Sequence, residues 1–290
     1  MDVQARIERA LERALSYAAG NNGQPKQLVE AMRYSVFPGG ARVRPRLCLA
    51  VAYSCGDPAP EASDAAAAAI ELLHCASLVH DDMPCFDNAD LRRGKPTVHE
   101  AFGEPLALLA GDALIVLAFE TIARECATVP ERIGPLISTL GRSVGMPYGI
   151  VAGQAWESEP EIVLEDYHRA KTTALFSCAT TAGAIAAGSD PQVWYGVGDA
   201  LGNAYQVADD LRDAVSSESE LGKPIGQDER NCRPNAVAEL GIEGALARLV
   251  GHVQAAVDAI PPCPGSAQLE QLIKSEAKRL RPKSLAQNAA

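Results

Sequence analysis

Aromatic residues are scarce in this chain, at 5% of its 290 residues, although hydrophobic residues make up 47%. Alanine fills much of the apolar share, and a core of alanine and leucine favours helices that pack closely together. Strand signals are nearly absent as well, because no succession of alternating β-branched runs is separated by turn residues. We therefore expect an all-α fold.

Cysteine pairs of the CxxC type are also missing, although the chain has eight cysteines. The chain is too long for a disulfide scaffold, and a reduced thiol in an apolar run behaves as a small hydrophobic group. This pattern predicts a reducing, cytoplasmic setting.

Acidic residues outnumber Lys and Arg by 37 to 26, for a net charge of −11. Such a balance argues against nucleic acid or an anionic membrane as the main partner.

A hydrophobic leader is not evident, since the N-terminal MDVQARIERALERAL is charged and amphipathic. We therefore expect no signal peptide.

The uncharged stretch 172–189 is long enough to span a membrane. It is rich in Thr, Ser, Gly and Ala, however, which favours a tightly packed interior helix, and we expect no membrane span.

Apolar periodicity predicts helices that are separated by proline and glycine, in a single domain over residues 1–290. Several of these helices are apolar on all faces, which predicts that they are buried. The irregular stretch 216–235 is too long for a mere connector and suggests a functional loop. The predicted helical segments are 2–18, 26–35, 43–54, 63–83, 99–126, 130–154, 165–187, 191–214, 235–259 and 267–279.

The first acidic cluster lies at the end of an apolar helix, in LVHDDMPCFDNADLRRGKPT at 78–97. Asp81 and Asp82 stand at a helix C-terminus, where the macrodipole is unfavourable to anions, and Asp87 adds a third negative charge. A positive group should offset this repulsion. Two candidates are the arginines that follow at 92–93 and a divalent cation.

The second acidic cluster is AYQVADDLRD at 204–213. On a helix, Asp209 and Asp213 share a face, and so do Gln206 and Asp210. Oxygen ligands on one stripe suit Mg²⁺, which keeps several waters and bridges to substrate phosphates. A single cluster of this kind is common on acidic surface helices, where arginines form solvated ion pairs. Two clusters about 130 residues apart, each followed by Gly-Lys, instead favour a clamp for a polyanion.

At these motifs the sequence resembles the trans-prenyltransferases, the isoprenyl diphosphate synthases of the polyprenyl synthetase family. The resemblance spans nearly the whole chain, and its RPNAV segment is most similar to synthases of bacterial carotenoid pathways. The motifs that carry it are PGGARVRP at 38–45, DDMPCFD with LRRGKPT, GQ at 153–154, KTTALF at 171–176, and QVADDLRD with GKPIGQD.

The resemblance implies an isoprenoid synthase fold, with about ten or more helices around a central cavity, usually as a homodimer. It also implies a reaction in which an allylic diphosphate (dimethylallyl, geranyl or farnesyl) ionises to an allylic cation. The cation alkylates isopentenyl diphosphate, and a proton is then lost. Mg²⁺ is the implied cofactor, for which Mn²⁺ could substitute.

Carried over residue by residue, the resemblance assigns roles to both clusters. The implied metal ligands are Asp81, Asp82, Asp87, Asp209 and Asp213. The side chains implied to contact the allylic diphosphate are Arg92, Lys171 and Lys223. Those implied to hold isopentenyl diphosphate are Arg44, His74 and Arg93. The oxygens of Thr172 and Gln206 would face the carbocation, so the implied catalytic group is Lys171, Thr172, Gln206 and Lys223.

The sequence departs from the family pattern at Ala41, where the family has a lysine in its Gly-Gly-Lys segment. One cation for isopentenyl diphosphate is therefore missing, and Arg42 or Arg44 is a candidate to compensate for it. Two other kinds of protein remain open: a non-catalytic subunit of a prenyl synthase and a terpene cyclase. The aspartates argue against the first, and the paired arginines at 92–93 argue against the second.

Product length is expected to depend on the helix that precedes Asp81. In this family a bulky aromatic side chain four or five positions before the motif stops growth at farnesyl length. Here those positions are Ser77 and Ala76, which are small. We therefore expect geranylgeranyl diphosphate as the product, with farnesyl diphosphate as the alternative. A floor to the cavity would then come from elsewhere, with Phe119 and Met146 as candidates.

Overall fold

The structure is a computed structural model, and it describes residues 2–20, 25–37, 40–215 and 235–280. The described residues are mainly helical, which confirms the expected all-α fold. The α-helices are α1 (Val3–Ala19), α2 (Lys26–Val36), α3 (Val43–Ser54), α4 (Pro60–Asp81), α5 (Val98–Phe102), α6 (Glu104–Glu125), α7 (Ile133–Val144), α8 (Ile150–Trp156), α9 (Leu164–His168), α10 (Ala174–Ala186), α11 (Gln192–Val215), α14 (Ala236–Asp258) and α15 (Ser266–Leu280).

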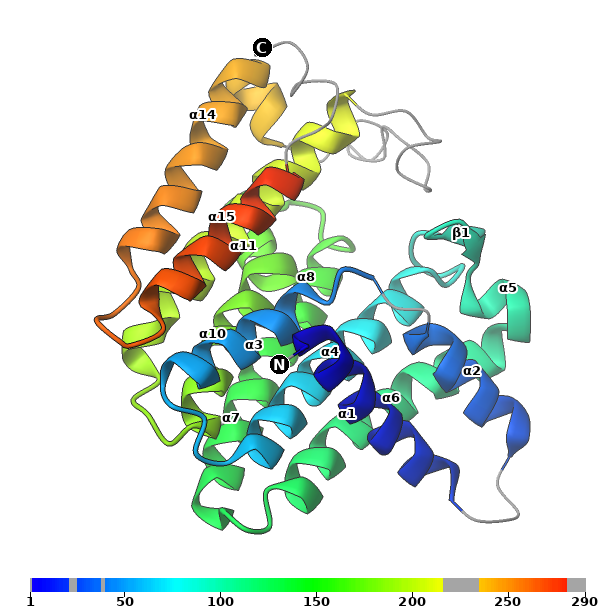
Figure 1. Ribbon diagram of the computed structural model, residues 1–290. Coiled ribbons are helices and arrows are strands. Elements are labelled where there is room, and N and C mark those ends of the chain that lie inside the picture. The colour runs from blue at the N-terminus through cyan, green and yellow to red at the C-terminus, as the bar shows by residue number, and fades with distance from the viewer. Residues whose placement is uncertain (1, 21–24, 38–39, 216–234, 281–290) are drawn as a thin grey trace.

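Four further elements complete the described part of the chain. A 3₁₀ turn, η1, covers Pro130–Arg132, and a π-helical segment, η2, covers Arg169–Thr173. The two-residue strands β1 (Leu91–Arg92) and β2 (Lys95–Pro96) form a small antiparallel hairpin. α14 lies along α11 at one side of the molecule, and α2, α5 and the hairpin lie at the opposite side (Figure 1).

Helices α4 and α10 form much of the interior. Every residue of α10 from Leu175 to Ala186 is buried, and so are five consecutive alanines of α4, at 65–69. Small side chains let the neighbouring helices approach, and α3, α4 and α7 all contact α10. The uncharged stretch 172–189 is therefore largely an interior helix, as the sequence predicts.

Two of the described helices, α4 and α6, are long and apolar enough to cross a membrane by length and composition alone. The most apolar part of α4 is 78% buried inside the protein, as in the core helix of a soluble protein. That of α6 is only 44% buried, so a mainly apolar stripe of α6, interrupted by Asp112, stays exposed. Leu109 and Val116, seven residues apart, lie on this stripe.

Two predicted helices are divided in the structure. The segment predicted at 99–126 breaks at Gly103, whose positive φ of 85° glycine adopts without steric cost. The segment predicted at 130–154 breaks between Val144 and Ile150, where the Met146–Pro147 peptide bond is cis. Both breaks contain glycine and proline, in FGEP at 102–105 and in GMPYG at 145–149. These residues commonly end helices, so the two single-helix predictions were wrong although the sequence contains the break signals.

The segment predicted as one helix at 165–187 contains the π-helical turn η2, a feature that is often found at functional sites. α8 and α11 approach η2 closely. A β-carbon added to Gly153 of α8 would lie 2.5 Å from Lys171 Cα, and one added to Gly202 of α11 would lie 2.5 Å from Thr173 Cα. Both positions therefore require glycine.

A buried arginine joins the N-terminal helices to α4. The side chain of Arg42 is fully buried, and its guanidinium donates to Glu71 at 2.8 Å, to Glu8 at 3.0 Å and to the Val36 carbonyl at 2.8 Å. Glu71, on α4, is itself only 2% exposed. The buried charges of this cluster are therefore compensated within it.

We expect Arg42→Ala to lower the free energy of unfolding by about 3–5 kcal/mol, because it leaves the buried Glu71 without its cation. Arg33→Ala is the matched control. Arg33 pairs with Glu12 at 2.8 Å on the surface, and an exposed pair contributes at most about 1 kcal/mol. Urea unfolding followed by circular dichroism measures both variants, and equal losses would contradict the prediction.

Candidate active site

The first acidic cluster lies at the C-terminus of α4, opposite the β hairpin. Arg93 and Gly94, both with positive φ, form the two-residue turn of this hairpin. The hairpin brings Arg92 over the helix end, where its Nε lies 2.8 and 2.7 Å from the two carboxylate oxygens of Asp82. Asp82 is 3% exposed, and burial raises its pKa although the bonds to Arg92 act in the opposite direction.

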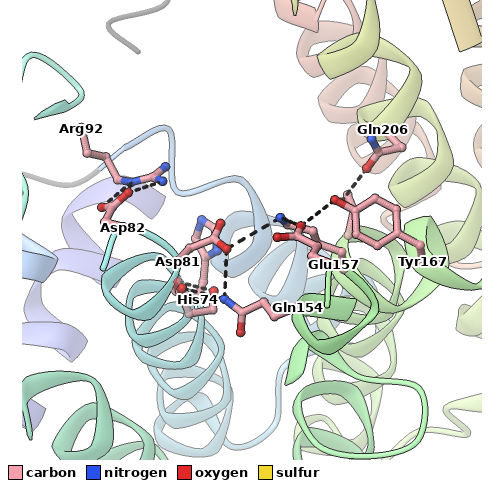
Figure 2. Close-up of polar contacts among 11 residues, drawn as sticks. His74, Asp81, Asp82, Arg92, Gln154, Glu157, Tyr167 and Gln206 are labelled. Carbon is pink, nitrogen blue, oxygen red and sulfur yellow. Dashed lines mark hydrogen bonds and ion pairs between the residues drawn. The ribbon is translucent and has the colours of Figure 1, made fainter. Parts of the chain in front are cut away.

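Asp81 faces a different set of partners, on α8 and η2 (Figure 2). Its Oδ1 lies 3.3 Å from Gln154 Nε2 and 3.7 Å from Lys171 Nζ. The Gln154 amide also donates to the Ser77 carbonyl at 3.1 Å, one turn earlier on α4. Gln154 thus holds α8 against the end of α4.

Lys171 is surrounded by acidic and phenolic groups. Its ammonium forms an ion pair with Glu157, and the same Glu157 oxygen accepts a hydrogen bond of 2.7 Å from the Tyr167 hydroxyl. Burial lowers the pKa of Lys171, but Asp81, Tyr167 and Glu157 together raise it above that of an ordinary lysine. Lys171 therefore stays cationic, as a ligand for an anionic group must.

Sequence reasoning missed Glu157 and Tyr167. Glu157 lies three residues after Gln154, so helical spacing places both side chains on one face, toward the end of α4. That spacing is the signal that could have found Glu157. The contact of Tyr167 depends on how η2 joins α9, and no local pattern indicates it.

Thr172 and Gln206 are in direct contact. The Thr172 hydroxyl donates to Gln206 Oε1 at 2.8 Å, and Gln206 Nε2 donates to Asp210 at 3.0 Å. The structure thus brings η2 and α11 together through the two residues whose oxygens the sequence predicts near a carbocation.

Arg44, His74 and Arg93, predicted to share one ligand, also lie near one another. Arg44 Nη1 lies 3.3 Å from His74 Nε2, and the Arg44 guanidinium stacks 4.5 Å from the centre of the Phe176 ring. Burial, followed by the charges of Arg44 and Arg93, lowers the pKa of His74 well below its usual value. Arg44 Nε is buried and has no hydrogen-bond partner among the described residues.

Arg42 cannot replace the cation that Ala41 lacks. Its side chain is fully buried in its cluster with Glu8 and Glu71, so this candidate was wrong. Arg93 is better placed, since a β-carbon on Gly40 would lie 2.5 Å from its Nη2. Its guanidinium therefore lies against the backbone that precedes Ala41.

A small apolar pocket lies behind Phe176, between α3, α10, α11 and α15. The residues that line it are Val43, Leu47, Phe176, Leu201, Tyr205, Leu272, Ile273 and Glu276. α4 contributes no residue to this pocket. The predicted cavity beside Ala76, which is buried, and Ser77 is therefore a different space and stays a prediction.

The remaining predicted metal ligands lie on the two acidic elements. Asp87 follows α4 and donates its backbone N–H to the Asp81 carbonyl at 3.0 Å. On α11, Asp209 pairs with Arg212 at 2.8 Å, and Asp213 lies one turn further along. Within the described part of the chain, no three acidic, His or Cys side chains converge on one point that could hold a metal ion.

These residues nevertheless fit Mg²⁺. The ion is usually bound by one or two carboxylates, with waters and substrate phosphates as its other ligands, rather than by a cage of protein groups. All the predicted ligands supply oxygen, and Asp81, Asp82 and Asp209 each face a cationic side chain that could also bind phosphate. Lys223 lies outside the residues that the structure describes.

Comparison with known proteins gives a consistent result over nearly the whole chain. The sequence profile of the family "Polyprenyl synthetase" matches residues 25–254. The chain is 53% identical to a geranylgeranyl diphosphate synthase of Cereibacter sphaeroides, over 99% of each sequence. It is 52% identical to a geranylgeranyl diphosphate synthase of Rhodobacter capsulatus, over 97% of this chain and 96% of that one.

Solved structures agree with this result. A geranyltransferase from Legionella pneumophila superimposes with a TM-score of 0.81 and 27% identity, over 95% of this chain and 94% of that one. A geranyltransferase from Helicobacter pylori, complexed with magnesium and isoprenyl diphosphate, gives a TM-score of 0.78 and 28% identity, over 96% and 98% of the two chains.

Proposed function

The chain belongs to the polyprenyl synthetase family, and on that premise we propose that it is a geranylgeranyl diphosphate synthase. It transfers prenyl groups, condensing isopentenyl diphosphate with dimethylallyl, geranyl and farnesyl diphosphates. The observation that carries this proposal is the junction at η2. There Lys171 faces Asp81 of the first cluster, while the adjacent Thr172 bonds Gln206 of the second.

The allylic diphosphate is bound between the two acidic clusters. Arg92 and Lys171 contact its oxygens, together with Lys223. Both described cations are held in place beforehand, Arg92 by Asp82 and Lys171 by Glu157. The residues that would hold Mg²⁺ are Asp81, Asp82, Asp87, Asp209 and Asp213. The bound ion would neutralise charge on the diphosphate and make it a better leaving group.

Departure of the diphosphate leaves an allylic cation near η2. Thr172 and Gln206 present oxygen dipoles there, which stabilise positive charge without forming a bond to it. The second substrate, isopentenyl diphosphate, is held by Arg44, His74 and Arg93. A neutral His74 accepts from Arg44 and so orients the guanidinium, while the stack on Phe176 holds its plane.

The alternatives have less support. Two relatives that are more than 50% identical are named for the geranylgeranyl product, which favours it over farnesyl diphosphate. A non-catalytic subunit would be expected to have lost part of the polar site, yet Asp81, Lys171, Thr172 and Gln206 are all in contact with partners. The apolar stripe on α6 supports a homodimer. The eight scattered cysteines support a reducing, cytoplasmic setting. The similarity of the RPNAV segment to synthases of bacterial carotenoid pathways supports a role in carotenoid synthesis.

We expect activity to require Mg²⁺ or Mn²⁺ and to disappear with a chelator. Asp81→Ala and Asp209→Ala should each lower turnover by at least about 100-fold, the scale seen when one group that stabilises a transition state is removed. Asp258→Ala, at the exposed end of α14, is the matched control and should leave turnover unchanged. Incorporation of labelled isopentenyl diphosphate is the measurement, and near-normal turnover in either site variant would overturn the metal clamp.

The product length is tested at Ala76, which is 1% exposed on α4. A tyrosine in Ala76→Tyr would fill the space below Asp81 and overpack it, so the main product should shorten from geranylgeranyl to farnesyl diphosphate. Ser77→Ala keeps the volume small and should leave product length unchanged. Chromatography of the dephosphorylated products measures both. The prediction would be refuted if the wild type stops at farnesyl diphosphate, or if the main product of Ala76→Tyr is as long as that of the wild type.

The homodimer is tested on α6. Val116 is 68% exposed on the apolar stripe, and burying a charge there without a partner is costly. Val116→Glu should therefore convert a dimer of about 61 kDa, twice the chain mass of 30.5 kDa, to monomers in light scattering after gel filtration. Val193→Glu places the same charge on an exposed valine of α11 and should leave the dimer intact. A wild-type monomer would contradict the proposal.

A further inference from the structure

Asp210, the second acid of the QVADD segment, is among the most buried charged groups of the site, at 2% exposure. Its two carboxylate oxygens accept hydrogen bonds from different elements. Oδ1 accepts from Gln206 Nε2 at 3.0 Å, and Oδ2 accepts from the backbone N–H of Ala236 at 2.8 Å. Asp210 therefore links the last quarter of α11 to the first residue of α14.

The direction of these hydrogen bonds is determined by the carboxylate of Asp210. A backbone N–H can only donate, and an ionised carboxylate can only accept. Gln206 must therefore turn its amide nitrogen toward Asp210, which leaves its oxygen facing Thr172. The Thr172 hydroxyl donates to that oxygen at 2.8 Å. With its proton used in this way, Thr172 can offer only lone pairs to a bound ligand.

We infer that Asp210 is a positioning residue, which sets the orientation of the Gln206 amide and, through it, the polarity of the Thr172 hydroxyl. The inference rests on the proposed function, in which both groups face an allylic cation. In the opposite orientation, the Gln206 amide would direct N–H toward Thr172, and the hydroxyl hydrogen would be free to point at the cation. Positive ends of dipoles would then face a developing positive charge.

Asp210→Asn reverses the direction of the network. The asparagine oxygen still accepts from Ala236 N–H, because that donor cannot change, so its NH₂ group faces Gln206. Gln206 must then flip to present its oxygen. We expect kcat to fall at least about tenfold, because dipoles that stabilise the transition state are turned around. The KM values for both substrates should change by less than roughly twofold, because Arg92 and Lys171 are held by other acids, Asp82 and Glu157.

The reciprocal exchange gives the Thr172 hydroxyl an acceptor again. In the double variant Gln206→Glu with Asp210→Asn, the carboxylate introduced on α11 accepts from both the introduced amide and Thr172, and the net charge is that of the wild type. We expect its kcat to exceed that of Gln206→Glu alone by at least about fivefold, since neighbouring groups in one network are not additive. This comparison does not require that Asp210→Asn alone folds.

Asn235→Ala is the matched control for a purely structural role. Asn235 caps the same end of α14, where its side chain accepts from Ala238 N–H at 2.8 Å, but it makes no contact with Gln206. Asn235→Ala removes this cap, and Asp210→Asn replaces the ionised acceptor of Ala236 N–H with a neutral one, so both single variants weaken the start of α14. We expect thermal unfolding to shift in both and kcat to fall only in Asp210→Asn.

The amide orientation is also observable without turnover. Selective ¹⁵N-glutamine and methyl-threonine labelling should show a nuclear Overhauser contact between the Gln206 amide protons and the Thr172 methyl group that is stronger in Asp210→Asn than in the wild type. An inactive wild type would refute the proposed function, and this spectrum would still test the orientation. An active wild type whose kcat survives Asp210→Asn, an unimproved double variant, or unchanged spectra would each refute the positioning role.

Discussion

The ion pair between Lys171 and Glu157 is the interaction on which the rest of the site depends. It fixes a cation on η2 between the end of α4 and α8, and Asp81 shares the same ammonium. The next residue, Thr172, reaches α11 through Gln206. Two acidic elements that would otherwise repel each other are thus linked by consecutive residues of one short turn, whose π-helical form belongs to the site itself.

Charge compensation follows the same rule elsewhere in the protein. Arg92 lies over Asp82, and Arg42 lies between Glu8 and Glu71, so the buried Asp82 and Glu71 each face a cation brought by a different element. The two arginines differ in availability. Arg42 is enclosed and structural, whereas Arg92 remains partly exposed at the helix end and can exchange its carboxylate for a phosphate.

Sequence patterns predict most of the helices, because apolar periodicity reflects burial, and they predict which acids gather at the ends of α4 and α11. The predicted helices run through the breaks at Gly103 and near Pro147, although the glycines and prolines there are break signals that the sequence contains. The burial of Arg42 and the link from Asp210 to Ala236 could not be predicted from the sequence. Both depend on contacts between residues 26 or more positions apart, which local spacing does not encode.

Gly153 and Gly202 have no functional side chain, yet each presses on the backbone of η2 from a different helix. Even a methyl group at either position would push Lys171 and Thr172 away from their partners. The mutational target for inactivating this protein is thus larger than its set of charged and polar residues. A natural variant at Gly153 or Gly202 would lose activity in the same way as a variant of a catalytic residue. A survey restricted to ionisable side chains would overlook both positions.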